Sequence, residues 1–253
     1  MPLETESFGP PRQRLTGQVA EIWRATRDVT LMRLDPGPEG PFVFRAGQYA
    51  QLTFADLPPR DYSIGSRPDQ RLLEFHIRDT GDGGSSSYVA DRLQQGESVG
   101  IEGPFGRCFL REQETGPILA VAGGSGLAPM KSIIETALEG GHRDEIRLYF
   151  GVRRATDLYL RDQLEDLALR FGNFAYHLVL SEEAPSDHAR GGLVTDVIAE
   201  DLPDLSGFTA YMAGPPPMVE AARSLLVRLG LPSGRLFADP FLTEGELLRQ
   251  GRG

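Results

Sequence analysis

The hydrophobic pattern of this 253-residue chain changes its period near residues 112–116, and this change limits the folds that are possible. Before it, short apolar and β-branched runs are separated by turns rich in glycine and proline, such as Asp35-Pro36-Gly37. This pattern predicts a small antiparallel barrel or sandwich with one helical insert at about residues 86–93, and only the motifs described below favour the barrel. The expected strands cover residues 15–24, 28–34, 42–54, 62–66, 72–79 and 98–102.

After the change, five strand-length apolar runs alternate with segments of helical spacing, which is typical of a parallel α/β sheet. Thr156 is expected to be the N-cap of one helix, and Gly230 and Pro232 are expected to end the last one. We therefore expect a β + α/β fold, with an antiparallel β-barrel over residues 11–114 and a five-stranded parallel α/β domain with a C-terminal tail over residues 115–253. The expected strands cover 117–122, 145–150, 174–180, 209–213 and 235–238, and the helices 129–138, 157–170, 193–199 and 218–229.

Composition excludes several classes of function. A formal charge of −10 argues against nonspecific nucleic-acid binding, which needs clustered positive charge. No apolar run is long enough to span a membrane and the acidic N-terminus does not resemble a signal peptide, so we expect a cytoplasmic protein. Cys108 is the only cysteine, which excludes a disulfide, a zinc ribbon or a cysteine-ligated iron–sulfur cluster inside the chain. We expect Cys108 to be simply buried.

Three motifs lie in the barrel half. Arg60, Tyr62 and Ser63 stand at strand spacing and can bind a phosphate, a flat ring and a ring nitrogen, although an ordinary strand with mixed faces would also explain them. Residues 83–89 (GGSSSYV) run into the helical insert and suit either an anion or a flexible helix cap. Residues 103–106 (GPFG), taken alone, indicate a structural turn.

Two further motifs follow strands of the α/β half. Residues 121–129 (VAGGSGLAP) offer glycines for a tight turn and the close approach of a pyrophosphate, and a proline suited to the first helical turn. This is not the usual dinucleotide fingerprint, because Pro129 stands where its third glycine would be. Residues 211–218 (YMAGPPPM) lie at the carboxyl end of a strand, where ligands bind, but a proline-stiffened loop opening a helix is the structural alternative.

The order of these five motifs resembles that of the ferredoxin–NAD(P)H reductase family. The resemblance extends over roughly residues 15–241 and includes two further stretches, 46–49 (AGQY) and 149–153 (YFGVR). It implies that the barrel binds a flavin, FAD rather than FMN, and that the α/β domain binds a nicotinamide cofactor. The protein would then be an NAD(P)H-dependent flavoprotein oxidoreductase, and no metal or nucleophile is expected.

The resemblance also implies roles for residues of the barrel. Ser63 would hydrogen-bond near flavin N5 and take part in catalysis, and Tyr62 would pack on the isoalloxazine. His76-Ile77-Arg78 matches the stretch that passes the pyrophosphate or adenine end of the flavin, yet we expect His76 to be an outward residue of an alternating strand. The remaining flavin-binding residues would be Arg60 and Ser86 for phosphate, with Ile77, Arg78 and Gly83.

In the α/β half, the resemblance assigns residues of the two loops to the nicotinamide cofactor. Asp239 would lie near the nicotinamide as a second catalytic residue, and Phe241 would cover the flavin ring. Ala213 departs from the family, which usually has cysteine there; hydride transfer should survive this change. Gly124, Gly126 and Pro129 would take the pyrophosphate, and Gly214, Pro215, Pro216 and Met218 would line the approach to the ring.

Preference between the two nicotinamide cofactors depends on charge near the ribose. Arg153 and Arg154 would favour the 2′-phosphate of NADPH, whereas Glu182 and Glu183 would repel it. We favour NADH.

The electron acceptor follows from the single cysteine. Many members of the family carry a four-cysteine ferredoxin-like domain on the same chain, and this chain has no such set. We therefore expect a separate iron–sulfur protein, such as a ferredoxin or oxygenase component, to take the electrons. The alternatives are a flavin reductase that releases reduced flavin and a non-catalytic flavin- or NAD-binding subunit.

Overall fold

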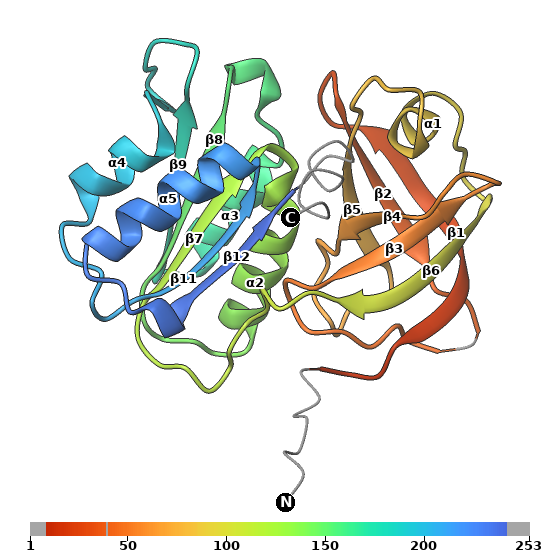
Figure 1. Cartoon of the computed structure of the whole chain (residues 1–253), viewed down its shortest axis with the longest axis horizontal. Coiled ribbons are helices and arrows are strands. Elements are labelled where there is room, and N and C mark those ends of the chain that lie inside the picture. The colour runs from red at the N-terminus through yellow and green to blue at the C-terminus, as the bar shows by residue number, and fades with distance from the viewer. Residues whose placement is uncertain (1–8, 39, 242–253) are drawn as a thin grey trace, which may run out of the picture.

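The computed structural model describes residues 9–38 and 40–241, which form two domains side by side (Figure 1). The first contains β1 (Gln13–Arg24), β2 (Val29–Asp35), β3 (Tyr49–Phe54), β4 (Arg60–Ser63), β5 (Leu73–Arg78), the helix α1 (Ser85–Asp91) and β6 (Ser98–Phe105). Its strands form one antiparallel sheet in the order β4-β3-β6-β1-β2-β5. A bridge between Ile64 and Phe75 joins the two ends of this sheet, so the strands form the expected, nearly closed barrel.

The barrel is held by a core of aromatic and aliphatic side chains. Along β3, buried and half-buried residues alternate, as they do in a strand with one face on a core. Leu52 and Phe54 from β3 and Phe75 from β5 are fully buried in this core. A β-bulge between Val19 and Glu21 lets the long strand β1 bend around it.

The second domain contains β7 (Ile118–Gly123), α2 (Leu127–Glu139), β8 (Ile146–Val152), α3 (Arg161–Arg170), β9 (Phe174–Leu180), β10 (Arg190–Gly191), α4 (Val194–Asp201), β11 (Thr209–Gly214), α5 (Pro216–Arg228) and β12 (Leu236–Pro240). Its strands form a parallel sheet in the order β10-β9-β8-β7-β11-β12. The central strand β7 is buried along its whole length because helices cover both faces of the sheet. Side chains of α2 and α3 pack on one face, and those of α4 and α5 pack on the other.

Some details differ from the sequence expectations. The parallel sheet has a sixth strand, β10, whose two residues are too few to leave a hydrophobic pattern. Residues 42–48 are irregular, and only Tyr49–Phe54 form a strand. The helix expected from residue 157 begins at Arg161, after Leu160 in a left-handed conformation, so Thr156 is not its N-cap. Gly230 does follow the last helix with a positive φ of 90°, as expected.

Helix α2 lies between the parallel sheet and the barrel (Figure 1). Two of its side chains bond to the barrel: Lys131 Nζ donates to the Gly65 carbonyl at 3.3 Å, and Ser132 Oγ donates to the Ser66 carbonyl at 2.7 Å. Ala46 and Cys108 from the barrel half belong to the same apolar cluster as the buried face of α2. The two domains therefore share an apolar cluster at their interface, separate from the core inside the barrel.

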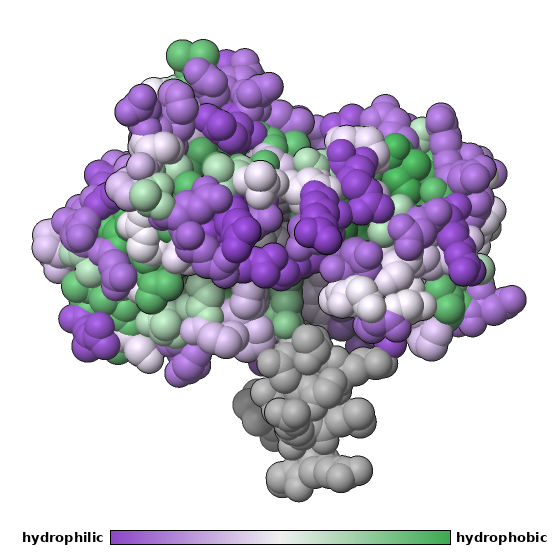
Figure 2. Space-filling model, turned by 90° about the horizontal axis from the view of Figure 1, so that it is seen from above, coloured by the Kyte–Doolittle hydropathy of each residue, from purple (hydrophilic) through white to green (hydrophobic). Residues whose placement is uncertain are grey.

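No helix within residues 9–38 and 40–241 is long and apolar enough to cross a membrane. The face turned to the viewer in Figure 2 is largely hydrophilic, and strongly hydrophilic residues gather where the two domains meet.

Candidate cofactor site

The loops after β7 and β11 meet at the carboxyl edge of the parallel sheet, and their glycines allow them to pack together. A Cβ on Gly126 would lie 2.1 Å from the Ala213 carbonyl oxygen. Gly214 has a φ of 142°, and a Cβ there would lie 2.8 Å from the Gly123 carbonyl oxygen. Packing between the loops is therefore sufficient reason for glycine at 126 and 214, whatever the loops bind.

Gly124 differs from these glycines because it opens to free space. Its φ is 55°, and nothing lies within 4 Å of where a Cβ would stand. A cofactor can approach the backbone closely here, which makes Gly124 the loop glycine best suited to a pyrophosphate. Pro129 is the third residue of α2 and is buried, so its ring packs at the start of the helix.

The loop after β11, which contains Pro215 and leads into Pro216, packs on the loop after β7. Pro216 is the first residue of α5, where proline costs no hydrogen bond. The Pro215 ring and the Met218 sulfur lie 2.8 and 2.6 Å from the position of a Cβ on Gly123, so both residues pack directly on that backbone. The loop thus combines a stiffened backbone with a methionine at the sheet edge.

The C-terminal strand β12 brings Asp239 and Phe241 to the same edge. Asp239 pairs with Ala213 in the β11–β12 register, and the Phe241 N–H donates to the Gly214 carbonyl at 2.9 Å. Burial raises the pKa of Asp239 to about 6, and the nearby charge of Asp61 adds to the shift. Asp61 lies on β4, so the carboxylate of Asp239 is near enough to the predicted flavin strand to be influenced by its charge.

Cys108 is buried, as expected, and does not replace the missing loop cysteine. Its Sγ lies 4.0 Å from the Met212 carbonyl, behind the backbone that carries Ala213. Burial, and then the charge of Asp239, raise the pKa of the thiol to about 12, so it stays protonated.

On β4, the three predicted flavin residues are half-buried. Tyr62 packs edge-on against Phe54, with ring centres 6.0 Å apart, and burial raises the pKa of its phenol. Ser63 pairs with Tyr49 of β3, and its hydroxyl forms no hydrogen bond within the described part of the chain. The hydroxyl is therefore available to a ligand, as the prediction for Ser63 requires.

The loop before α1 also keeps space for a ligand. Gly83 has a φ of 74°, with nothing within 4 Å of a Cβ position. No side-chain hydrogen bond caps the N-terminus of α1. The Ser86 hydroxyl, however, turns toward Thr80, whose N–H donates to it at 3.3 Å.

Ile77 and Arg78 follow His76 on β5, and both were predicted to bind the flavin. The Ile77 side chain lies in the barrel core, so this residue can offer a ligand only its main chain. Arg78 donates to Asp28 at 3.0 Å, and Arg153 of the other domain lies 3.9 Å from the same carboxylate. Asp28 thus brings together two arginines that were predicted for two different cofactors.

The prediction of an outward-facing His76 is wrong. The residue is 4% exposed, with Nδ1 3.0 Å from the Tyr159 hydroxyl and Nε2 3.1 Å from Glu74 Oε1. The five residues Leu73–Ile77 are all buried, because helix α2 covers the outer side of the strand. Alternation along one strand cannot reveal a second domain packed on its outer face.

Two acidic side chains after β9 form hydrogen bonds with residues that follow β8. Glu182 accepts from Arg154 Nε at 3.3 Å, and Glu183 accepts from the Ala155 N–H at 2.9 Å. One of the two arginines that would favour a 2′-phosphate is therefore already paired with a carboxylate.

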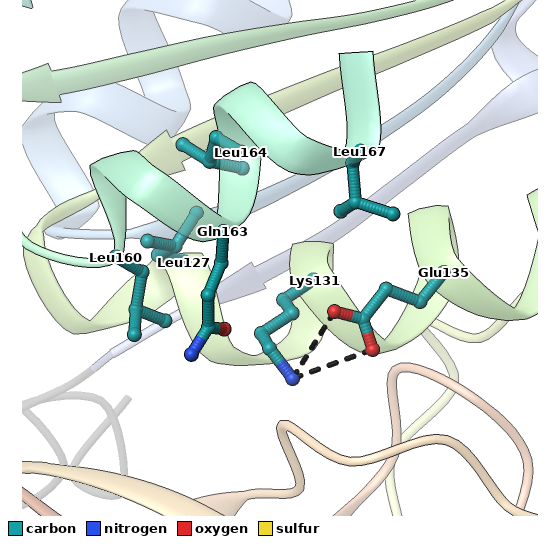
Figure 3. A pocket seen from close by; sticks show the side chains of 7 residues that line it. All are labelled: Leu127, Lys131, Glu135, Leu160, Gln163, Leu164 and Leu167. Atoms are coloured by element: carbon teal, nitrogen blue, oxygen red, sulfur yellow. Dashed lines mark hydrogen bonds and ion pairs between the residues drawn. The ribbon is translucent and has the colours of Figure 1, made fainter. Parts of the chain in front are cut away.

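Two pockets lie between α2 and α3, and Leu127, which directly follows the glycines of the loop after β7, lines the smaller one. This smaller pocket, shown in Figure 3, has about 10 Å³ of room among leucine side chains and Gln163, beside the Lys131–Glu135 ion pair. The larger, of about 420 Å³, opens toward the barrel between Arg67 and Arg170, which both pair with Glu139. Neither pocket includes a predicted cofactor residue.

Comparison with known proteins agrees with this geometry. Residues 16–109 match the model of an oxidoreductase FAD-binding domain, and residues 120–224 match an oxidoreductase NAD-binding domain. The cofactors of the two domains are thus FAD and a nicotinamide dinucleotide.

Relatives that match nearly the whole of this chain belong to the same group of enzymes. The chain is 41% identical to the ferredoxin–NAD(P)+ reductase component of the naphthalene 1,2-dioxygenase/salicylate 5-hydroxylase systems of a Ralstonia species, over 97% of this chain and 74% of that protein. The solved cytochrome P450 reductase of Amycolatopsis has a TM-score of 0.86 at 34% identity, over 91% of this chain and 70% of that one. The ferredoxin reductase of carbazole 1,9a-dioxygenase has a TM-score of 0.82 at 24% identity, over 92% and 70%, and shares the fold. This chain belongs to the ferredoxin–NAD(P)H reductase family and is an NAD(P)H-dependent flavoprotein oxidoreductase.

Proposed function

We propose that this protein takes electrons from NADH and delivers them through FAD to a separate iron–sulfur protein. The observation that carries the proposal is the meeting of three elements at one edge: β4 with Ser63, the glycine loop with Gly124, and β12 with Asp239. These elements belong to different domains, and the charge of Asp61 on β4 influences Asp239 on β12. When bound, the nicotinamide supplies a hydride, and the flavin accepts two electrons and releases them singly.

We assign each group a separate task at this edge. Arg60 and the N–H groups at the start of α1 bind the flavin phosphates, Tyr62 and Phe241 cover the ring, and the Ser63 hydroxyl bonds near N5. Gly124 lets the nicotinamide pyrophosphate approach, while Met218 and the prolines shape the entrance. Asp239 stabilises the positive charge that develops on the nicotinamide as it loses hydride.

NADH is favoured over NADPH because of the acidic end of β9. The carboxylate of Glu182 engages Arg154, and Glu183 holds the adjoining backbone, so a 2′-phosphate would meet two negative charges. The second arginine, Arg153, lies near Asp28 and Asp157.

The preference is tested by anaerobic stopped-flow reduction of the bound FAD with each nicotinamide. We expect the ratio of reduction rate to dissociation constant to be at least about tenfold higher for NADH. The variant Glu182→Gln frees Arg154 and should raise this ratio for NADPH about tenfold with little effect on NADH. Equal use of both cofactors by the unaltered protein would contradict the preference.

An iron–sulfur acceptor is supported by the relatives. Two of the relatives are named as ferredoxin–NAD(P)+ reductase components of oxygenase systems.

The acceptor is tested by anaerobic mixing of NADH and the yellow holoprotein with purified [2Fe–2S] ferredoxins, using cytochrome c as the final reporter. We expect NADH-dependent reduction of at least one ferredoxin, with FAD retained on gel filtration. Release of reduced flavin without ferredoxin reduction would favour a flavin reductase instead. A colourless protein that stays inactive with added FAD and NADH would favour a non-catalytic subunit.

A further inference from the structure

A buried imidazole joins the two domains directly beside the nicotinamide loop. His76 on β5 and Tyr159, which precedes α3, are only 4% and 5% exposed, and His76 Nδ1 lies 3.0 Å from the tyrosine oxygen. The Tyr159 ring packs edge-on against His76 and Phe150, with ring centres 5.4 and 5.7 Å apart. The contact is therefore enclosed on the barrel side and on the sheet side.

Tyr159 also reaches the glycine loop. Its hydroxyl donates to the Gly124 carbonyl at 3.3 Å, and Gly124 is the glycine whose surroundings are open to a cofactor. A hydroxyl has one hydrogen, so it can donate to this carbonyl only while His76 Nδ1–H donates to the tyrosine oxygen. The position of the loop carbonyl is thus linked to the hydrogen-bonding state of a histidine in the barrel.

The other side of the imidazole is fixed by charged groups. His76 Nε2 lies 3.1 Å from Glu74 Oε1, which also lies 3.1 Å from Lys131 Nζ. Arg33 Nε donates to the second oxygen of Glu74 at 2.9 Å, and Lys131 pairs with Glu135 at 3.3 Å (Figure 3). Glu74 can accept from Nε2–H, and the ring donates on both sides at once only as an imidazolium, since a neutral imidazole has one N–H.

Helix α2 provides an independent tie between the same two regions. It begins directly after the glycine loop, and its residues Lys131 and Ser132 donate to the carbonyls of Gly65 and Ser66. These carbonyls follow Ser63 closely in the chain. A Cβ on Gly65 would lie 3.1 Å from His76 Nε2 and 3.5 Å from the Ala128 side chain, so this glycine lets the three segments pack together.

On this geometry, and given the proposed NADH-to-FAD reaction, we propose that His76 and Tyr159 are positioning residues for hydride transfer. They hold the Gly124 carbonyl, and with it the nicotinamide loop, at a fixed place relative to the flavin strand β4. Neither side chain is proposed to touch the reacting atoms. Their effect is confined to the half-reaction that uses the nicotinamide.

The first test is the variant Tyr159→Phe, which removes the hydroxyl and keeps the ring. We expect FAD content and thermal midpoint to stay close to those of the unaltered protein. The dissociation constant for NADH should rise, or the limiting rate of FAD reduction fall, by about 3- to 10-fold, the effect of one lost hydrogen bond. Reoxidation of the reduced protein by ferricyanide does not use the loop and should keep its rate.

The matched control is Tyr176→Phe, in β9 of the same domain. The Tyr176 hydroxyl forms no hydrogen bond within the described part of the chain, and its ring stacks only on Phe174. Both half-reactions should be unchanged in this variant.

Two variants of His76 test the hydrogen bonds of its two ring nitrogens separately. An asparagine amide occupies the place of Nδ1 and a glutamine amide that of Nε2, so His76→Asn keeps a partner for Tyr159, whereas His76→Gln keeps one for Glu74. We expect H76N to stay close to the unaltered protein and H76Q to resemble Tyr159→Phe in the reductive half-reaction.

Two results would overturn the inference. One is an unchanged reductive half-reaction in Tyr159→Phe. The other is equal impairment of H76N and H76Q in the reductive half-reaction, with reoxidation by ferricyanide slowed to the same extent. This second result would indicate a merely structural role for His76. Failure of the proposed function is a distinct outcome, because the unaltered FAD-loaded protein would then not be reduced by NADH at all.

Discussion

Among single residues, Asp239 carries the most informative electrostatic shift at the proposed site. Burial raises its pKa to about 6, and the charge of Asp61 adds to this, so the carboxyl is mainly ionised at pH 8 and mainly protonated at pH 5. A nicotinamide that loses hydride becomes positively charged, and an adjacent carboxylate lowers the energy of that state. The ionised form of Asp239 should therefore be the faster one.

We predict that the limiting rate of FAD reduction by NADH falls as the pH decreases through about 6. Asp239→Asn should be about tenfold slower at pH 8 and should lose this pH dependence, since its amide does not titrate. Stopped-flow rates between pH 5 and 8 measure both effects, with Asp61→Asn as a variant that removes only the secondary charge. A D239N variant whose rate still follows a pKa near 6 would show that another group titrates.

At the scale of elements, the two loops at the sheet edge depend on each other. Gly126 has no room for a side chain, because a Cβ would overlap the Ala213 carbonyl oxygen at 2.1 Å. The neighbouring main chain of β11 is fully buried and cannot move aside easily. The loop after β7 is therefore built to fit the loop after β11.

We predict that Gly126→Ala lowers the free energy of unfolding by about 2–4 kcal/mol, because the two loops must separate. NADH-driven reduction of FAD should fall with it. The control is Gly172→Ala, where nothing lies within 4 Å of the new Cβ, and its effect should be within about 0.5 kcal/mol. Denaturant titration of both variants provides the comparison, and similar values for the two would argue against the packing explanation.

At the scale of the whole molecule, the interface between the domains contains a buried charge as well as a shared apolar cluster. Burial alone would raise the pKa of Glu74, but its bond to His76, the charge of Lys131 and its bond to Arg33 hold the pKa well below its ordinary value of 4.5. A carboxyl with a depressed pKa stabilises the fold above its ordinary pKa. That contribution is lost as the pH falls below about 4.5 toward the depressed value.

We predict that Glu74→Gln is less stable than the unaltered protein by about 3–5 kcal/mol at pH 7, because it leaves Lys131 and Arg33 short of a buried carboxylate. The difference should shrink as the pH falls below about 4.5, where Glu74 itself begins to gain a proton. The control Glu21→Gln removes an exposed partner of the same Arg33 and should cost less than about 1 kcal/mol. A difference that stays constant down to pH 3 would contradict the assigned role of the charge.

Hydrophobic period and turn residues were enough to predict most elements, because both act over a few neighbouring residues. They located the barrel strands, the strands and helices of the α/β half, and the glycine after α5. They failed at Thr156, where Leu160 takes a left-handed conformation and delays α3, and at β10, which is too short to have a period. Residues beyond Phe241 lie outside the described part of the chain.

For this protein, the sequence by itself determined the fold class, the family and the stretches that supply the proposed cofactor residues, because each of these is written in local patterns and their order. Only the tertiary structure decided what the side chains of those stretches face. It placed Asp239 beside Ala213, put the Ile77 side chain into the barrel core, and turned His76 inward to Tyr159 of the other domain. The physical reason is that burial and hydrogen bonding between distant segments depend on how the domains pack, and no local pattern records that packing.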